Sequence, residues 1–362
     1  LVGSEMCIRD RINMILNLIK ERKVSTSKEK ASIAIYGAGA IGGHLGAMLS
    51  KAGFEVSLIA RGDHLKAINQ NGLRLIAKDQ DFITRPRATS NPSELGPQDY
   101  VIMSLKSYQA PDVVEQMQPL LGENTTVATA MNGIPWWYFY GLPGQWENHK
   151  IKSVDPEGKQ WDGIRPERAI GCITYVASEV VEPGIVKTIS PSYQYQIGEP
   201  DGSVSPRCKL LQRMVVAAGI NCDIKPNIRR DIWIKVMGNV AYNPTSALTM
   251  AHTGAMLDDP SMEQVLRQLM TEVLAVGKAL GANPEDKIDA RLNTTRERAA
   301  AHKTSMLQDL ERGRPLEIMP IIGATSELAR LVRVPTPIID TVLAIVKLRA
   351  KMTGQLPSTE IR

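Results

Sequence analysis

Three glycines near the start of the chain have the spacing of a dinucleotide-binding loop. The stretch reads Gly37-Ala38-Gly39-Ala40-Ile41-Gly42, with an apolar run over 33–36 before it and a helical pattern after it. In such loops the first glycine allows a tight turn, the second lets the backbone approach a pyrophosphate, and the third lets helix and strand pack closely. The spacing alone also fits an ordinary glycine-rich loop, but the flanking strand and helix favour a cofactor site.

The end of the next predicted strand indicates which dinucleotide is bound. NAD sites usually carry an acidic residue about 20 residues after the glycines, whereas an arginine there accommodates the 2′-phosphate of NADP. The predicted strand 55–60 is followed by Arg61, with no acid at its tip. We therefore expect NADP(H). The alternative is that Arg61 is a solvated loop residue and that Asp63 binds the ribose.

Polar side chains also follow two later strands of the predicted sheet. Lys106 comes after the strand 100–105, and Asn132 follows the strand 125–131. Ligands of open α/β sheets bind beyond the carboxyl ends of the strands. Lys106 could thus contact cofactor phosphates or substrate, and Asn132 could bind substrate or the nicotinamide ribose; either could equally be a solvated strand-end residue.

A predicted helix in the second half carries a line of polar residues. Lys235, Asn239 and Asn243 recur every four residues and so share one face of that helix. Apolar residues flank this line, so it is either a solvent-exposed face or the wall of a site. Asparagine is a poor helix former, which favours the second interpretation.

The order of predicted elements indicates two domains. We expect strands at 33–36, 55–60, 73–76, 100–105 and 125–131, with helices up to 51 and over 111–121; this alternation is typical of a parallel sheet covered on both faces. The sequence is β-rich over 169–189 and 193–197, helical over 206–218, and helical again from 227 to 351. The predicted fold is α/β: a Rossmann-type dinucleotide-binding domain over 31–226, with an irregular aromatic-rich insertion at about 135–168 that could overhang the site, and an all-helical C-terminal domain over 227–362.

Composition excludes several classes of function. The 362 residues are 43% hydrophobic and 22% charged, as in an ordinary protein of about two domains. The net charge of +5 includes +3 from residues 1–30 (seven basic, four acidic), so only +2 remains elsewhere and no nucleic-acid partner is expected. Four scattered cysteines indicate neither disulfides nor a metal site. We expect a cytoplasmic protein, since these cysteines are most simply thiols in a reducing compartment. We expect no membrane contact, since no run reaches the ~20 apolar residues of a membrane helix.

The first 30 residues are expected to lie outside the fold. Acidic residues interrupt the segment and no apolar core of a signal peptide follows. The stretch Met6-Cys7-Ile8-Arg9-Asp10-Arg11 resembles the translation of a sequencing adapter. We interpret about the first eleven residues as an assembly artefact.

Four separated stretches resemble the ketopantoate reductase (2-dehydropantoate 2-reductase) family. They are the glycine loop with Arg61; Leu105-Lys106-x-x-Gln109 with Asn132-Gly133; Trp233-x-Lys235-x-x-x-Asn239-x-x-x-Asn243-Pro244; and the stretch from Ser305-Met306-Leu307-Gln308-Asp309 through Arg312-Gly313-Arg314-Pro315 to Glu317-Ile318. The last two are quite specific in their order and spacing. The resemblance covers about residues 32–351.

The resemblance implies reduction of a 2-oxo acid by NADPH in a cleft between the domains, as a step of pantothenate and coenzyme A biosynthesis. Lys235 would be the general acid, and Glu317 would hold Lys235 or a substrate hydroxyl. The remaining implied roles are substrate binding by Asn239, Asn243 and Ser305, phosphate binding by Arg61 and Lys106, and cofactor binding by Asn132. Without the family, Glu317 could pair with Arg312 or Arg314, and Ser305 could be a helix N-cap.

Some positions depart from the family pattern. Leu316, the run 318–322 and His302 stand where many members have other residues, and the insertion at 135–168 is long. These changes leave open a paralogous NADP-dependent reductase of another 2-oxo acid. A non-catalytic NADP-binding regulator is the third reading, although it would have no use for the set Lys235, Asn239, Asn243, Ser305 and Glu317. A homodimer is possible.

Overall fold

The computed structural model describes residues 31–357 except 191 and 299, so the expectations for the first 30 residues lie outside the described part. Its main sheet has eight strands in the order β12-β11-β8-β7-β6-β1-β2-β5. The strands are β1 (Ser32–Tyr36), β2 (Glu55–Ile59), β5 (Arg87–Thr89), β6 (Tyr100–Met103), β7 (Thr126–Thr129), β8 (Ala169–Tyr175), β11 (Gln194–Gly198) and β12 (Asn221–Ile224). The strands from β5 to β8 all pair in parallel, and β11 pairs antiparallel with β8.

A second sheet packs against the helix α2 (Ala40–Lys51), which also contacts β1 and β2 of the main sheet. It contains β3 (Leu73–Ala77), β4 (Gln80–Thr84), β9 (Ser178–Glu182) and β10 (Ile185–Thr188) in the order β4-β3-β10-β9. The prediction that 73–76 belongs to the parallel sheet is therefore wrong. This strand pairs antiparallel with β4 through a short hairpin. A parallel pair needs a longer connection between its strands, usually a helix, and none lies between β3 and β4.

Helices of the first half include α2 (Ala40–Lys51), α3 (Gly62–Asn71), α4 (Val114–Met117), α5 (Lys159–Ile164) and α6 (Pro206–Ala217). The helix expected over 111–121 is only a four-residue α-helix between tight 3₁₀ turns. Pro119 explains part of this, because a proline has no N–H to donate and its ring clashes with the preceding turn.

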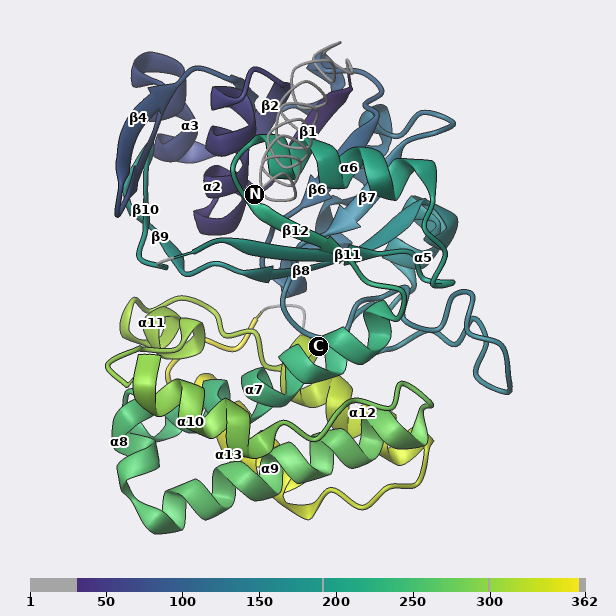
Figure 1. The fold of residues 1–362 in the computed structure, drawn as a ribbon, viewed down its shortest axis with the longest axis vertical. Helices are drawn as coiled ribbons and strands as arrows, with labels where there is room; N and C mark the ends of the chain where they lie inside the picture. The colour runs from purple at the N-terminus through teal and green to yellow at the C-terminus, as the bar shows by residue number, and fades with distance from the viewer. Residues whose placement is uncertain (1–30, 191, 299, 358–362) are drawn as a thin grey trace, which may run out of the picture.

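The second half is helical, as expected. Its helices are α7 (Ile228–Thr249), α8 (Thr253–Asp258), α9 (Pro260–Ala279), α10 (Ile288–Arg298), α11 (Ser305–Glu311), α12 (Ala324–Leu331) and α13 (Pro337–Met352). The side chain of Asn227 caps α7 by accepting from the Arg230 N–H at 3.1 Å. In Figure 1 the sheets lie above the helical half, and α7 runs from beneath the sheet into the helices.

The molecule has two hydrophobic cores, and one of them joins the two halves. One fills the space between the second sheet, α2, α6 and one face of the main sheet. The other begins on the opposite face of the main sheet and continues through α7 into the helical half. The aromatic cluster expected at 135–168 is part of this second core: Trp136, Trp137, Tyr138 and Phe139 are all fully buried in it.

None of the helices in the described ranges is both long and apolar enough to cross a membrane.

Candidate active site

The glycine loop has the conformation that its spacing predicts. Gly37 has φ +100°, a left-handed value that favours glycine. A Cβ on Gly42 would lie 2.2 Å from the Gly37 carbonyl oxygen and 2.3 Å from Ser104 Oγ, so only glycine fits there. A Cβ on Gly39 would meet nothing within 4 Å, which leaves open space beside the N-terminus of α2. This arrangement fits a pyrophosphate against the loop, because the first N–H groups of a helix lack partners inside the helix.

Arg61 lies beside this loop, immediately after β2. It is exposed and precedes the first residue of α3. Burial raises the pKa of the Tyr36 and Tyr108 phenols, and the nearby positive charge of Arg61 opposes that rise in both. Arg61 therefore faces the carboxyl edge of the sheet. Asp63, the alternative ribose ligand, pairs with Lys66 at 3.0 Å.

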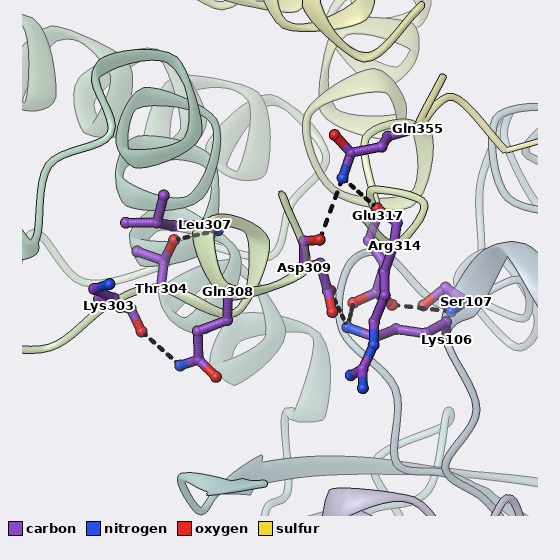
Figure 2. A network of polar contacts seen from close by, with 10 residues as sticks. All are labelled: Lys106, Ser107, Lys303, Thr304, Leu307, Gln308, Asp309, Arg314, Glu317 and Gln355. Carbon is purple, nitrogen blue, oxygen red and sulfur yellow. Dashed lines mark hydrogen bonds and ion pairs between the residues drawn. The ribbon is translucent and has the colours of Figure 1, made fainter. Parts of the chain in front are cut away.

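Lys106 connects the two halves of the molecule. Its Nζ lies 2.6 Å from Asp309 Oδ2 and 3.1 Å from Glu317 Oε2, as Figure 2 shows. Burial alone would lower the pKa of Lys106, but the charges of Glu317 and Asp309 outweigh it and raise that pKa. Burial raises the pKa of Asp309. Lys106 is thus held as a cation between two largely buried carboxylates, an arrangement that argues against the predicted contact with a cofactor phosphate.

Glu317 positions a loop in this structure. One oxygen binds Lys106, and the other accepts the Ser107 N–H at 3.0 Å. Ser107 Oγ in turn donates to the Asn132 carbonyl oxygen at 2.7 Å. The expected contact of Glu317 with Lys235 is therefore not formed, and neither is a pair with Arg312, which binds Glu179 instead.

The helical half supports the Asn132 loop at a second point. The Ile134 N–H donates to the Pro320 carbonyl oxygen at 3.0 Å. Gly133 has φ +95°, and a Cβ there would lie 2.1 Å from the same oxygen. The unusual run at 318–322 thus lies in the core, where Ile318, Ile321 and Ile322 are fully buried, and braces Asn132 through Pro320.

Lys235 faces a cavity at the carboxyl edge of the sheet. The cavity is small, with about 30 Å³ available to water-sized molecules, and its lining residues include Asn132, Gly133, Trp137, Thr174 and Lys235. Lys235 Nζ donates to the Thr174 carbonyl oxygen at 2.8 Å and lies 4.6 Å from the centre of the Tyr175 ring. No described carboxylate pairs with it. Burial, and then the charge of Arg291, lower the pKa of Lys235 to about 8.

The other predicted substrate-binding residues lie on α7 and at the start of α11. Asn239 Nδ2 is buried without a hydrogen-bond partner among the described residues, which leaves a donor available. Asn243, one turn further, is buried. Ser305 begins α11 and is partly exposed, but the N-cap is Thr304, whose hydroxyl accepts from the Leu307 N–H at 3.2 Å. The N-cap alternative for Ser305 is therefore wrong.

Two residues near Lys235 could not be identified from the spacing of residues in the sequence. Arg291 comes from α10, and His302 comes from the segment before α11. Burial, then the charges of Arg291 and Lys235, lower the pKa of His302. His302 stands out only as a departure from the family pattern, and nothing in the sequence singles out Arg291.

Comparison with known proteins identifies the family. Residues 33–202 match the model of ketopantoate reductase PanE/ApbA, and residues 227–350 match the model of its C-terminal domain. The chain belongs to the ketopantoate reductase family. A 2-dehydropantoate 2-reductase from Mesorhizobium japonicum is 44% identical over 323 residues, which cover 89% of this chain and 98% of that protein.

Solved structures agree with the ketopantoate reductase assignment. A provisionally assigned ketopantoate reductase from Ralstonia solanacearum superposes with a TM-score of 0.85 at 37% identity, covering 91% of this chain and all of the other. A 2-dehydropantoate 2-reductase from Methylococcus capsulatus gives 0.76 at 27% identity, covering 89% and 97% of the two chains. The family resemblance and the Rossmann-like sheet followed by a helical half are confirmed. The roles of the individual site residues stay predictions.

Proposed function

We propose that this protein reduces 2-dehydropantoate to (R)-pantoate with NADPH, a step of pantothenate and coenzyme A biosynthesis. The observation that carries the proposal is the environment of Lys235: its ammonium faces the cavity, no carboxylate of the described residues pairs with it, and its pKa is about 8. A general acid works best when its pKa is near the working pH. Relatives across most of the chain are 2-dehydropantoate 2-reductases.

The residues at the sheet edge fit NADPH. The loop Gly37–Gly42 and the N-terminus of α2 would hold the pyrophosphate, and Arg61 would bind the 2′-phosphate. When bound, NADPH supplies a hydride to the ketone carbon. Asn132 would lie on the catalytic side of the cofactor, where Ser107 and Pro320 fix its loop.

Lys235 would complete the reduction by supplying a proton. Its ammonium stabilises the negative charge that develops on the ketone oxygen and then transfers a proton to that oxygen, giving a 2-hydroxy acid and a neutral lysine. Solvent would return the proton after product release. Asn239 would donate its free N–H to the substrate, with Asn243 and Ser305 completing the pocket. Glu317 would position the loop through Ser107.

The test is steady-state NADPH oxidation with 2-dehydropantoate beside a panel of smaller and larger 2-oxo acids. We expect a kcat/KM for 2-dehydropantoate far above the others. Better turnover of another 2-oxo acid would change the proposed substrate but leave the proposed cofactor and the role of Lys235 in place. Absence of turnover with every 2-oxo acid would overturn the proposal.

We also propose a homodimer located in the cytoplasm. The described cysteines, Cys172, Cys208 and Cys222, are all buried free thiols, which suits a reducing compartment. Ile345, Leu348 and Met352 are exposed on one side of α13 and could pack against a second copy. Light scattering during size-exclusion chromatography would give the mass, and a monomer at micromolar concentration would contradict the dimer.

A further inference from the structure

The guanidinium of Arg291 packs against the backbone of α7 beside the predicted substrate face, on the side of Lys235 away from Asn239. A Cβ on Gly238 would lie 2.9 Å from Arg291 Nη2 and 3.1 Å from its Nε. Gly238 is three residues after Lys235 and directly before Asn239. Glycine is unfavourable in a helix interior relative to alanine, but here it leaves room for the guanidinium.

Arg291 differs from its neighbours in having no anion beside it. Arg296 on the same helix pairs with Glu263, and Arg267 pairs with both Glu263 and Asp289. Within residues 31–357, apart from 191 and 299, no carboxylate pairs with Arg291, and its Nε is buried without a hydrogen-bond partner. Its aromatic neighbour is Tyr242, whose ring centre lies 6.0 Å from Cζ.

A second cation makes this arrangement unfavourable in the free protein. Arg291 is close enough to Lys235 and His302 for its charge to lower the pKa of both. Two unpaired cations held together, one of them partly buried, repel each other and lack counter-charges. An anion that binds between them would remove this cost.

We propose that Arg291 binds the carboxylate of the 2-oxo acid while Lys235 faces the adjacent ketone oxygen. This inference rests on the proposed function and names a specificity residue for it. A guanidinium matches a carboxylate with two parallel hydrogen bonds, which a lysine cannot do. In a 2-oxo acid the carboxylate and the ketone are on neighbouring carbons, so two cations beside the same stretch of α7 can contact both groups.

The assignment also couples binding to catalysis. The groups that act on the Lys235 ammonium are Thr174 and Tyr175 on β8, and Arg291 and His302 from the helical half. A carboxylate on Arg291 offsets the positive charge that now disfavours protonated Lys235. Substrate binding thereby favours the form of Lys235 that can donate a proton.

The first test compares Arg291→Gln with Arg296→Gln, a matched exposed arginine on the same helix. We expect Arg291→Gln to raise KM for the 2-oxo acid about 10- to 100-fold, the range for a lost charged hydrogen bond. The corresponding 2-oxo amide should be affected much less, so the preference for acid over amide should collapse. Arg296→Gln should keep both the KM and the preference, and NADPH binding should be unchanged in both variants.

A second variant tests the position of the guanidinium without removing its charge. Gly238→Ala places a methyl group against Nη2, and the flexible arginine can move away, so the protein should remain folded. We expect a higher KM and weaker binding of pantoate, measured by calorimetry in the presence of NADP⁺, with no loss of thermal stability. Unchanged KM and acid preference in both Arg291→Gln and Gly238→Ala would overturn the inference. A wild-type protein inactive with all 2-oxo acids would instead overturn the proposed function.

Discussion

Two lysines at the same edge of the sheet have opposite surroundings. Lys106 Nζ lies between Asp309 and Glu317 at 2.6 and 3.1 Å, and these charges raise its pKa. Among the described residues, the partners of Lys235 Nζ are the Thr174 carbonyl oxygen at 2.8 Å and the Tyr175 ring, and the pKa of Lys235 is about 8. Lys106 therefore holds its proton firmly, whereas Lys235 can release one near neutral pH.

The difference separates a structural role from a chemical one. The carboxylates around Lys106 come from the helical half, so this ion pair ties the two halves together across the site. The charge that acts on Lys235 is another cation, Arg291, which destabilises its protonated form. The sign of the neighbouring charge thus distinguishes Lys106, which holds the two halves together, from Lys235, which we propose as the acid.

The largest expected effect is on catalysis at Lys235. Lys235→Ala should lower kcat by about 10²- to 10⁴-fold, because the general acid is lost. NADPH affinity, measured by fluorescence titration, should stay within about twofold, since the cofactor loop is on the other half. Near-normal turnover would exclude Lys235 as the acid.

The next effect is on stability at Lys106. Lys106→Met leaves Asp309 and Glu317 without their shared cation, and losing one partner of a buried ion pair costs about 3–5 kcal/mol. Because the side chain of Lys106 is 33% exposed, we expect the lower end, about 3 kcal/mol, from chemical denaturation. Lys66→Met, which removes an exposed pair with Asp63, is the control and should unfold like the wild type. Equal stability of both variants would remove the bracing role.

A smaller effect concerns the cofactor preference. Arg61→Ala should weaken the binding of NADPH by about tenfold, as expected for one lost charged hydrogen bond at an exposed site. The affinity for NADH should be nearly unchanged. Dissociation constants for both cofactors check this. Equal weakening of NADPH and NADH would show that Arg61 does not contact the 2′-phosphate.

Features that depend on local spacing could be predicted from the sequence. The glycine loop is one example, because Gly37 has the left-handed φ and Gly42 the lack of room for a Cβ that the spacing predicts. The polar face of α7 is another, because a period of four residues fixes which side chains lie together. The helical second half and the family assignment followed from such patterns and are confirmed.

Contacts between distant segments could not be predicted in the same way. Lys106 and Glu317 are 211 residues apart, so no spacing rule could show that one binds the other. Arg291 comes from a helix whose sequence shows an ordinary charged surface, and only its packing on Gly238 brings it to the site. The strand predicted at 73–76 forms the β3–β4 hairpin outside the parallel sheet. Strand pairing, unlike strand formation, depends on which partner strands are available.

The most direct test of this account is the pH dependence of kcat/KM for 2-dehydropantoate at saturating NADPH. If Lys235 is the general acid, kcat/KM should be constant below its pKa, half-maximal near pH 8, and tenfold lower for each further pH unit. The reason is that the protonated form is required and disappears as the pH rises. Because the pKa of Lys106 is raised, its titration should not change kcat/KM in this range. A profile that stays flat to about pH 10, or the same limb in Lys235→Ala, would contradict the assignment.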